Sequence, residues 1–150
     1  MVPSQYRRCA ARISLIAESY ERLLGQPLVE GKDTVAELWQ AAPAIVAHGT
    51  EADPIFFFGN RTALRLFDAS IEQFTMLPSR MSAEAPLRAE REELMDRVRT
   101  QGFIDDYAGV RIALSGNRFR IERATVWNLI DAAGAIRGQA AAFADWSPPD

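Results

Sequence analysis

Hydrophobic residues recur every three or four positions between residues 4 and 24, and polar or charged residues fill most of the positions between them. This spacing predicts an amphipathic helix, Ser4–Leu24, which Gly25 and then Pro27 bring to an end. Its apolar face consists of Tyr6, Cys9, Ile13, Ile16, Ala17, Tyr20, Leu23 and Leu24. We expect this face to pack on the sheet of its own chain or on the same helix of a second copy.

The pattern then changes to short apolar runs that are separated by turn-forming residues. Thr34 and Glu37 fit a capping box, which predicts the start of a short helix. Two strands are expected next, Ala44–Ala47 and Ile55–Phe58, with a tight polar turn over residues 49–54 between them. The centre of the chain is therefore predicted to be strand, turn, strand and then helix.

Three further helix starts follow the second of these strands. Asn60 is suited to cap the helix that comes directly after it. Ser70 and Gln73 fit a second capping box, which predicts another turn of helix. A longer helix is expected over Pro86–Gln101, because proline suits its first position and a glycine follows its last.

The last third of the chain predicts three antiparallel strands, Phe103–Leu114, Arg118–Ile130 and Ala135–Phe143, joined by hairpin turns that each contain a glycine. From Trp146 onward the chain is expected to leave the sheet. Strict alternation in the middle strand places on one face Phe119, Ile121, Arg123, Thr125, Trp127 and Leu129. The other face then holds Arg120, Glu122, Ala124, Val126, Asn128 and Ile130. Since both faces carry apolar residues, both are expected to be covered.

Composition narrows the classes of function. The 150 residues are 48% hydrophobic and 25% charged, which fits one globular domain with its own core. Twenty acidic and 17 basic residues leave a net charge of −3, and no basic run occurs, so direct nucleic-acid binding is not expected. No apolar run is long enough to span a membrane, no secretion signal is visible, and a single cysteine excludes an internal disulfide. A cytoplasmic protein without membrane attachment is the expectation.

Several phrases of the chain together resemble the MEKHLA domain family, which is a group within the PAS-like superfamily. The matching phrases are His48–Phe56, Gly59–Leu64, Leu77–Arg80, Gly102–Ile112, Phe119–Glu122 and Val126–Leu129. The resemblance implies an α+β fold with a five-stranded antiparallel sheet in the order 2-1-5-4-3, helices on one face and an N-terminal amphipathic helix. We expect residues 1–33 to form that helix and a linker, and residues 34–150 to form the PAS-like domain of a standalone, bacterial-type protein.

The resemblance implies a non-enzymatic sensory or protein-interaction module, and it identifies neither a ligand nor a cofactor. Because no output domain is evident, a signal is expected to pass through association. A homodimer is the preferred arrangement, and a small-molecule ligand or a signalling protein are the other partners considered. The alternatives are a ligand-free dimeric scaffold and a small hydrolase or isomerase that uses His48 and Glu122.

His48 is the only histidine, and it raises the question of metal or catalytic chemistry. A metal site needs several clustered ligands, and Cys9 lies far away in the sequence. Neither a Gly-x-Ser-x-Gly motif nor a glycine-rich phosphate loop is present. Light-sensing PAS domains need a cysteine in the pocket, whereas Cys9 is expected to be a small apolar residue of the first helix. His48 is interpreted as a hydrogen-bonded residue at a strand end or as a polar contact of a ligand pocket.

The candidate ligand pocket lies between the sheet and the helices that cover one of its faces. Its expected lining consists of His48, Tyr107, Arg111, Glu122, Ala124, Asn128 and Ala141. Small residues on the last strand leave room there, and filling of that room by Phe67 and Leu94 is the alternative. A buried Glu122 would need an arginine partner, such as Arg80 or Arg111.

The opposite face of the sheet is expected to receive the N-terminal helix. The residues assigned to this helix-packing or dimer interface are Ile13, Ile16, Tyr20, Phe119, Ile121 and Trp127. Packing within one chain and packing across a dimer bury the same apolar stripe, so the sequence leaves both open.

Overall fold

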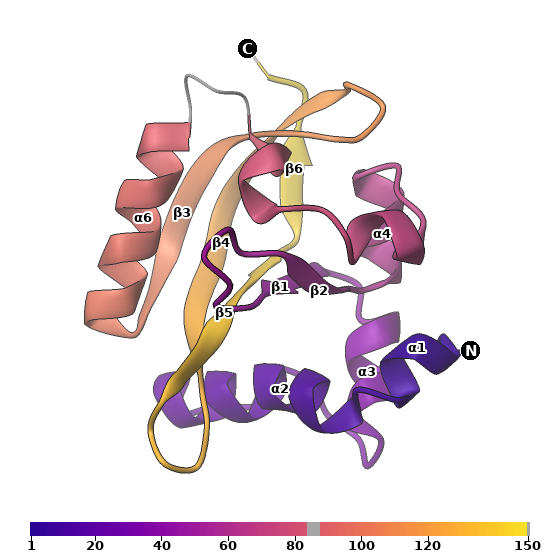
Figure 1. Cartoon of the computed structure of the whole chain (residues 1–150), viewed down its shortest axis with the longest axis vertical. Helices are drawn as coiled ribbons and strands as arrows, with labels where there is room; N and C mark the ends of the chain where they lie inside the picture. The colour runs from indigo at the N-terminus through magenta and orange to yellow at the C-terminus, as the bar shows by residue number, and fades with distance from the viewer. Residues whose placement is uncertain (84–87, 150) are drawn as a thin grey trace.

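The computed structural model describes residues 1–83 and 88–149, and an antiparallel sheet lies at its centre (Figure 1). The sheet consists of six strands: β1 (Ala44–His48), β2 (Phe56–Gly59), β3 (Phe103–Ile112), β4 (Arg118–Ile130), β5 (Ile136–Phe143) and β6 (Asp145–Ser147). Five of them run in the order β2-β1-β5-β4-β3, which confirms the predicted order. The predicted departure of the chain from the sheet at Trp146 is wrong, because β6 pairs with β4 beyond the end of β5.

Helices cover both faces of the sheet. They are α1 (Ser4–Arg7), α2 (Ala10–Leu24), α3 (Thr34–Gln40), α4 (Arg61–Leu66), α5 (Ile71–Phe74), the 3-10 helix η1 (Ser79–Ser82) and α6 (Arg88–Gln101). We call the face that carries α4, α5, η1 and α6 the front face, and the face that carries α1, α2 and α3 the back face. Figure 1 shows α6 alongside β3 and α2 across the other end of the sheet.

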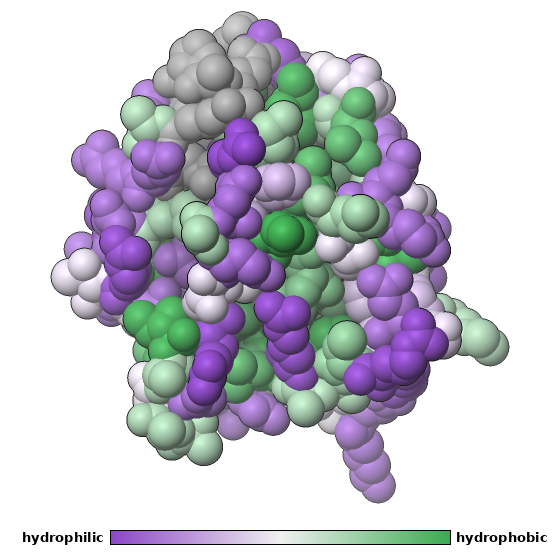
Figure 2. Space-filling view, viewed as in Figure 1, coloured by the Kyte–Doolittle hydropathy of each residue, from purple (hydrophilic) through white to green (hydrophobic). Residues whose placement is uncertain are grey.

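The long helix of the front face agrees with the sequence pattern over the residues that the structure describes. Its predicted first residue, Pro86, and the neighbouring Leu87 lie outside those residues. Figure 2 shows mainly hydrophilic side chains over α6 and hydrophobic ones in the middle of the same view.

None of the described helices is both long and apolar enough to cross a membrane.

Large side chains fill the back face. Ile13 and Ile16 of α2 are fully buried in one cluster with Trp127 of β4. The indole Nε1 of Trp127 donates to the carbonyl oxygen of Ile16 at 3.0 Å, and the ring of Tyr20 meets the indole edge-on at 4.9 Å. The apolar stripe of α2 is therefore used on the sheet of its own chain, and it joins residues 1–33 to the common core.

The predicted first helix is interrupted at Cys9, which separates α1 from α2. Cys9 is exposed at the N-cap of α2, so its predicted place on the apolar face is wrong. Tyr6 of α1 is buried, and its hydroxyl donates to the Gly59 carbonyl oxygen at 2.9 Å and accepts from the Gly59 nitrogen at 3.0 Å. Burial raises the pKa of Tyr6 to about 12, although the hydrogen bond to Gly59 acts in the opposite direction. Tyr6 thus satisfies both backbone groups of a residue in the edge strand β2.

Capping residues locate three of the helix starts. Asn60 caps α4, and Ser70 forms a capping box with Gln73 at the start of α5, so both predicted caps are confirmed. The cap of α3 is Asp33 rather than Thr34, because the Asp33 carboxylate accepts from a backbone nitrogen three residues later. Because these caps depend on hydrogen bonds between nearby residues, the helix starts can be predicted from sequence to within about one residue.

A bulge in β4 reverses the predicted sides of its first half. Arg123 has a φ of 54°, in the left-handed region, and the pairing of β4 with β3 shifts between Tyr107 and Gly109. Because one extra residue exchanges the two faces, Phe119 and Ile121 point to the front face and join its core. Their prediction as packing partners of the N-terminal helix is therefore wrong, whereas Trp127, beyond the bulge, lies on the back face.

Candidate ligand-binding site

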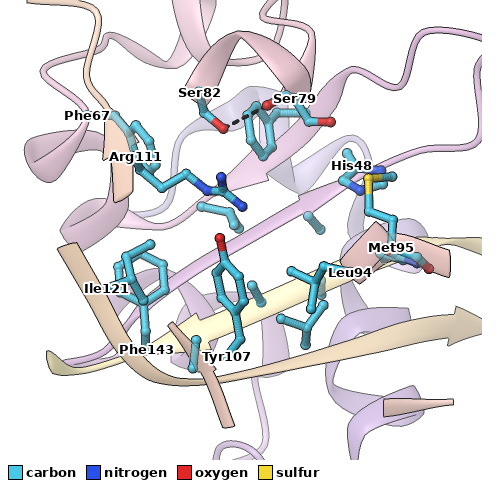
Figure 3. A pocket seen from close by; sticks show the side chains of 18 residues that line it. His48, Phe67, Ser79, Ser82, Leu94, Met95, Tyr107, Arg111, Ile121 and Phe143 are labelled. Atoms are coloured by element: carbon cyan, nitrogen blue, oxygen red, sulfur yellow. Dashed lines mark hydrogen bonds between the residues drawn. The ribbon is translucent and has the colours of Figure 1, made fainter. Parts of the chain in front are cut away.

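A cavity of about 70 Å³ lies between the front face of the sheet and the helices that cover it. Residues of β1, β3, β4 and β5 form its floor, and residues of α6 and η1 lie over it (Figure 3). The sequence-based pocket is expected at the same place, between the sheet and these helices.

The lining of the cavity is mostly apolar. Ala124 and Ala141, on neighbouring strands, are two of the small residues of its floor. Phe67 and Leu94, which the sequence offered as an alternative filling, border the cavity and do not occupy it. The space therefore exists because strands β4 and β5 carry methyl groups where larger side chains would close it.

Two polar groups meet inside this apolar lining. Tyr107 and Arg111 lie on β3 on either side of Gly109, and residues at this spacing share one face of a strand. A Cβ atom at Gly109 would come within 2.9 Å of the Tyr107 Cζ atom, so the glycine leaves space for the phenol. Figure 3 shows the Tyr107 hydroxyl and the Arg111 guanidinium pointing toward each other, with the guanidinium carbon 5.3 Å from the ring centre.

The charge of Arg111 is not balanced within the described part of the chain. The ion pairs found there belong to other arginines. Burial lowers the pKa of the Arg111 guanidinium, and the neighbouring Tyr107 partly offsets this effect. An arginine remains charged even so, and a partly buried cation without a counterion is costly. This end of the cavity is therefore suited to an anion.

The 3-10 helix η1 covers the cavity and is held by hydrogen bonds to its surroundings. The Ser82 hydroxyl donates to the Ser79 carbonyl oxygen at 2.7 Å, as Figure 3 shows. The Ser79 nitrogen donates to the carbonyl oxygen of Pro54 at 2.8 Å, and a β-bridge joins Ile55 to Pro78. These contacts connect η1 to the β1–β2 turn, so the cover of the cavity and its floor form one unit.

His48 lies at the end of β1, where it borders the cavity near Met95 of α6 (Figure 3). Its Nδ1 atom is 2.9 Å from the Gly49 carbonyl oxygen, and its ring meets that of Phe56 edge-on at 6.5 Å. The histidine is thus placed by local contacts and still faces the cavity. The hydrogen-bonded residue at a strand end is therefore what the structure shows, and a contact of His48 with a ligand stays a prediction.

Asn128 does not line this cavity, although the sequence assigned it to the pocket. Its side-chain nitrogen donates to the Val98 carbonyl oxygen of α6 at 3.0 Å. Gln139 of β5 donates to the Met95 carbonyl oxygen at 3.1 Å and to the Asn128 side-chain oxygen at 3.4 Å. These two buried amides hold α6 on the sheet, which places Leu94 and Met95 over the cavity.

Glu122 also lies outside the cavity, contrary to the prediction. It sits before the bulge, is exposed, and accepts a hydrogen bond from Arg120 at 3.3 Å. His48 and Asn128 both pair with Gln139, and Glu122 lies six residues away from Asn128 along β4, which corresponds to roughly 20 Å. The two residues of the hydrolase alternative are therefore not brought together.

Sequence reasoning named Leu94 of α6 but missed the residues of η1 and the neighbouring Met95. Ser79, Ser82 and Met95 line the cavity, but their distance from the sheet is set by tertiary contacts that no local pattern reports. Gln139 could have been predicted to line the cavity, because alternation along β5 places it on the same face as Ala141. Over residues 1–83 and 88–149, no group of three or more metal-ligating side chains occurs.

The family model that describes the MEKHLA domain matches residues 10–148, from the start of α2 to just beyond β6. The chain belongs to the MEKHLA domain family. The match includes α2 and α3 of the back face and every strand of the sheet, whereas α1 precedes it.

This MEKHLA domain is similar to two plant proteins. It is 25% identical over 138 residues to the homeobox-leucine zipper protein HOX9 of Oryza sativa subsp. indica. It is 25% identical over 140 residues to the homeobox-leucine zipper protein ATHB-14 of Arabidopsis thaliana. Each alignment covers 88% of the chain and 16% of the relative, so the chain spans a small part of their length. These relatives give no support to the expectation of a standalone, bacterial-type protein.

Solved structures show the same fold. A PAS domain from Colwellia psychrerythraea has a TM-score of 0.57 at 20% identity, over 70% of this chain and 86% of that one. A variant of the fungal photoreceptor Vivid has a TM-score of 0.61 at 14% identity, over 87% of this chain and 99% of that one. The MEKHLA domain is therefore a PAS-like α+β domain.

Proposed function

We propose that this MEKHLA domain is a non-catalytic sensory module that binds a small molecule in the cavity between its sheet and its helices. The cavity itself carries the proposal, because an apolar lining with a few convergent polar groups is typical of small-molecule sites. The PAS-like fold and the family membership support a role in signalling.

Two features of the site suit it to signalling. The floor strands β1, β4 and β5 carry α2 on their back face, and the cover of the cavity is formed by α6 and η1. A ligand that contacts both layers favours one arrangement of them over others, and a partner protein responds to that preference. A domain of this kind also fits a match to 16% of a much longer relative, where it would act as one module among several.

Homodimerisation remains a prediction within this proposal. The stripe of α2 that the sequence offered for a dimer is buried against the sheet of its own chain. A second copy would therefore dock on another surface, and the partner could equally be a different signalling protein.

Native mass spectrometry of the purified chain tests the proposal. The expected result is a stoichiometric mass excess that disappears on denaturation, together with a small molecule in the denatured extract. The same spectrum gives the number of chains per particle. A chain that carries no ligand, and whose cavity residues respond to no compound of a small-molecule panel in NMR titration, would falsify the ligand-binding role.

A further inference from the structure

The polar end of the cavity narrows the class of ligand. Arg111 and Tyr107 converge there, and Figure 3 shows both side chains directed into the space between β3 and η1. Resting on the proposed function, we infer that the cavity takes a small monocarboxylic acid with an apolar body, whose carboxylate binds the Arg111 guanidinium and the Tyr107 hydroxyl.

The charge balance of the lining favours a single negative charge. Among the described lining residues, Arg111 is the one permanently charged side chain, and no aspartate, glutamate or lysine is present. A carboxylate supplies one charge and a planar pair of oxygens, which matches the fork of a guanidinium. A phosphate monoester carries nearly two charges at neutral pH and would leave an unbalanced charge in an apolar site.

The size and chemistry of the remaining lining define the other end of the ligand. An apolar cavity of about 150 Å³ accepts benzene. The present cavity of about 70 Å³ therefore suits a body of only a few carbon atoms. Ala124, Val126 and Leu94 offer methyl groups to such a body.

Gly109 contributes to the site because it has no side chain. Since a side chain at this position would meet the Tyr107 ring, the glycine allows the phenol to lie along β3 toward Arg111. Gly109 thus acts as a positioning residue for the anion-binding pair. A Gly109→Ala variant displaces the hydroxyl and leaves every charge unchanged.

The test is an NMR titration of the full chain with three probes of similar size: butyrate, butyramide and butylamine. Butyrate is expected to shift the amides of cavity residues saturably, and butyramide and butylamine are expected to bind at least about tenfold more weakly. Arg111→Met should lower butyrate affinity about tenfold or more, and Tyr107→Phe and Gly109→Ala about fivefold. The matched control is Arg137→Gln, which removes one positive charge from an exposed ion pair on β5 and should bind butyrate like the wild type.

Each outcome separates this inference from the proposed function. If butyramide binds as tightly as butyrate, or if a folded Arg111→Met variant keeps wild-type affinity, the carboxylate inference is wrong and the cavity remains a ligand site. If none of the three probes shifts a cavity residue, the inference fails whether or not another ligand is found by mass spectrometry. Arg111→Lys, which keeps the charge, should retain part of the butyrate affinity and guards against loss through misfolding.

Discussion

The two faces of the sheet are built from neighbouring residues of the same strands, yet they are packed differently. On the back face, Ile13 and Ile16 of α2 are fully buried in one cluster with Trp127, and the indole N–H is hydrogen-bonded. On the front face, α6 and η1 leave a cavity. The Arg111 guanidinium lines this cavity and has no carboxylate partner among the described residues. One sheet therefore carries a closely packed cluster on one face and a cavity on the other.

The largest effect is expected where the back face is most tightly filled. Trp127→Ala removes a fully buried indole and its hydrogen bond, so it should lower the free energy of unfolding by about 4 kcal/mol. Urea unfolding followed by circular dichroism measures this loss. The matched control is Trp146→Ala at the partly exposed β6, which should cost well under half as much. Equal losses in the free energy of unfolding would show that Trp127 on the back face stabilises the fold no more than Trp146 on β6 does.

Tyr6 tests how α1 is held to the edge of the sheet. Tyr6→Phe leaves both backbone groups of Gly59 without their partner, which should cost about 2 kcal/mol near neutral pH. The folded-state pKa of about 12 lies above the usual value, so the folded chain retains a proton that the unfolded chain loses. The stabilisation is therefore complete below about pH 10 and declines by about 3 kcal/mol as the pH rises to about 12.

Urea unfolding of the wild type and of Tyr6→Phe at several pH values between 8 and 11.5 measures this dependence. The gap between the two proteins should narrow above pH 10, because the variant lacks the group that titrates. A gap that stays constant with pH would show that the phenol is not held protonated by burial.

Adjacent alanines of β5 allow the two faces to be compared with the same substitution. Both alanines contribute to the lining of the cavity, but Ala140 is buried in the back-face cluster, whereas Ala141 packs with the clusters of the front face. Ala140→Val should destabilise by about 1–2 kcal/mol through overpacking, and Ala141→Val should stay within about 0.5 kcal/mol of the wild type. Thermal unfolding of both variants measures the two losses of stability. If Ala141→Val is as destabilising as Ala140→Val, the front-face cavity has no room for the added methyl groups in solution.

The smallest effect, and the one opposite in sign, is expected at Arg111. Arg111→Met replaces a partly buried cation by an apolar side chain of similar length, and should raise the free energy of unfolding of the ligand-free chain by about 1 kcal/mol. Arg137→Gln, at an exposed ion pair, should leave it within about 0.5 kcal/mol. Chemical unfolding after removal of bound ligand measures both. A clear loss of stability in Arg111→Met would indicate that the arginine is structural.

Much of the lining of the candidate site could be predicted from the order of residues along β3 and β5. Tyr107, Arg111 and Ala141 line the cavity as expected, because alternation holds over those parts of the strands. Ala124 lines it also, while Glu122, two residues earlier on the same strand, does not. The error arises at Arg123, whose left-handed backbone is unusual for a residue with a side chain and has no local signal.

The partner of that bulge explains why sequence alone could not reveal it. Arg123 forms an ion pair with Asp145 at 2.9 Å, and Asp145 opens the strand β6 that pairs with Glu122. The bulge and β6 therefore occur together, and the two segments are more than twenty residues apart in the chain. Contacts across such separations are not encoded in any short window.

Local patterns in the chain are enough to predict the five main strands and their order, the caps at Asn60 and Ser70, and membership of the MEKHLA family. These properties depend on hydrogen bonds within a few residues and on the period of hydrophobic positions. Three further features depend on contacts between distant parts of the chain: the face that each half of β4 presents, the packing of α2 on its own sheet, and the meeting of Arg111 with Tyr107 in a cavity. Those outcomes depend on register between distant strands, and a shift of one residue exchanges the two faces.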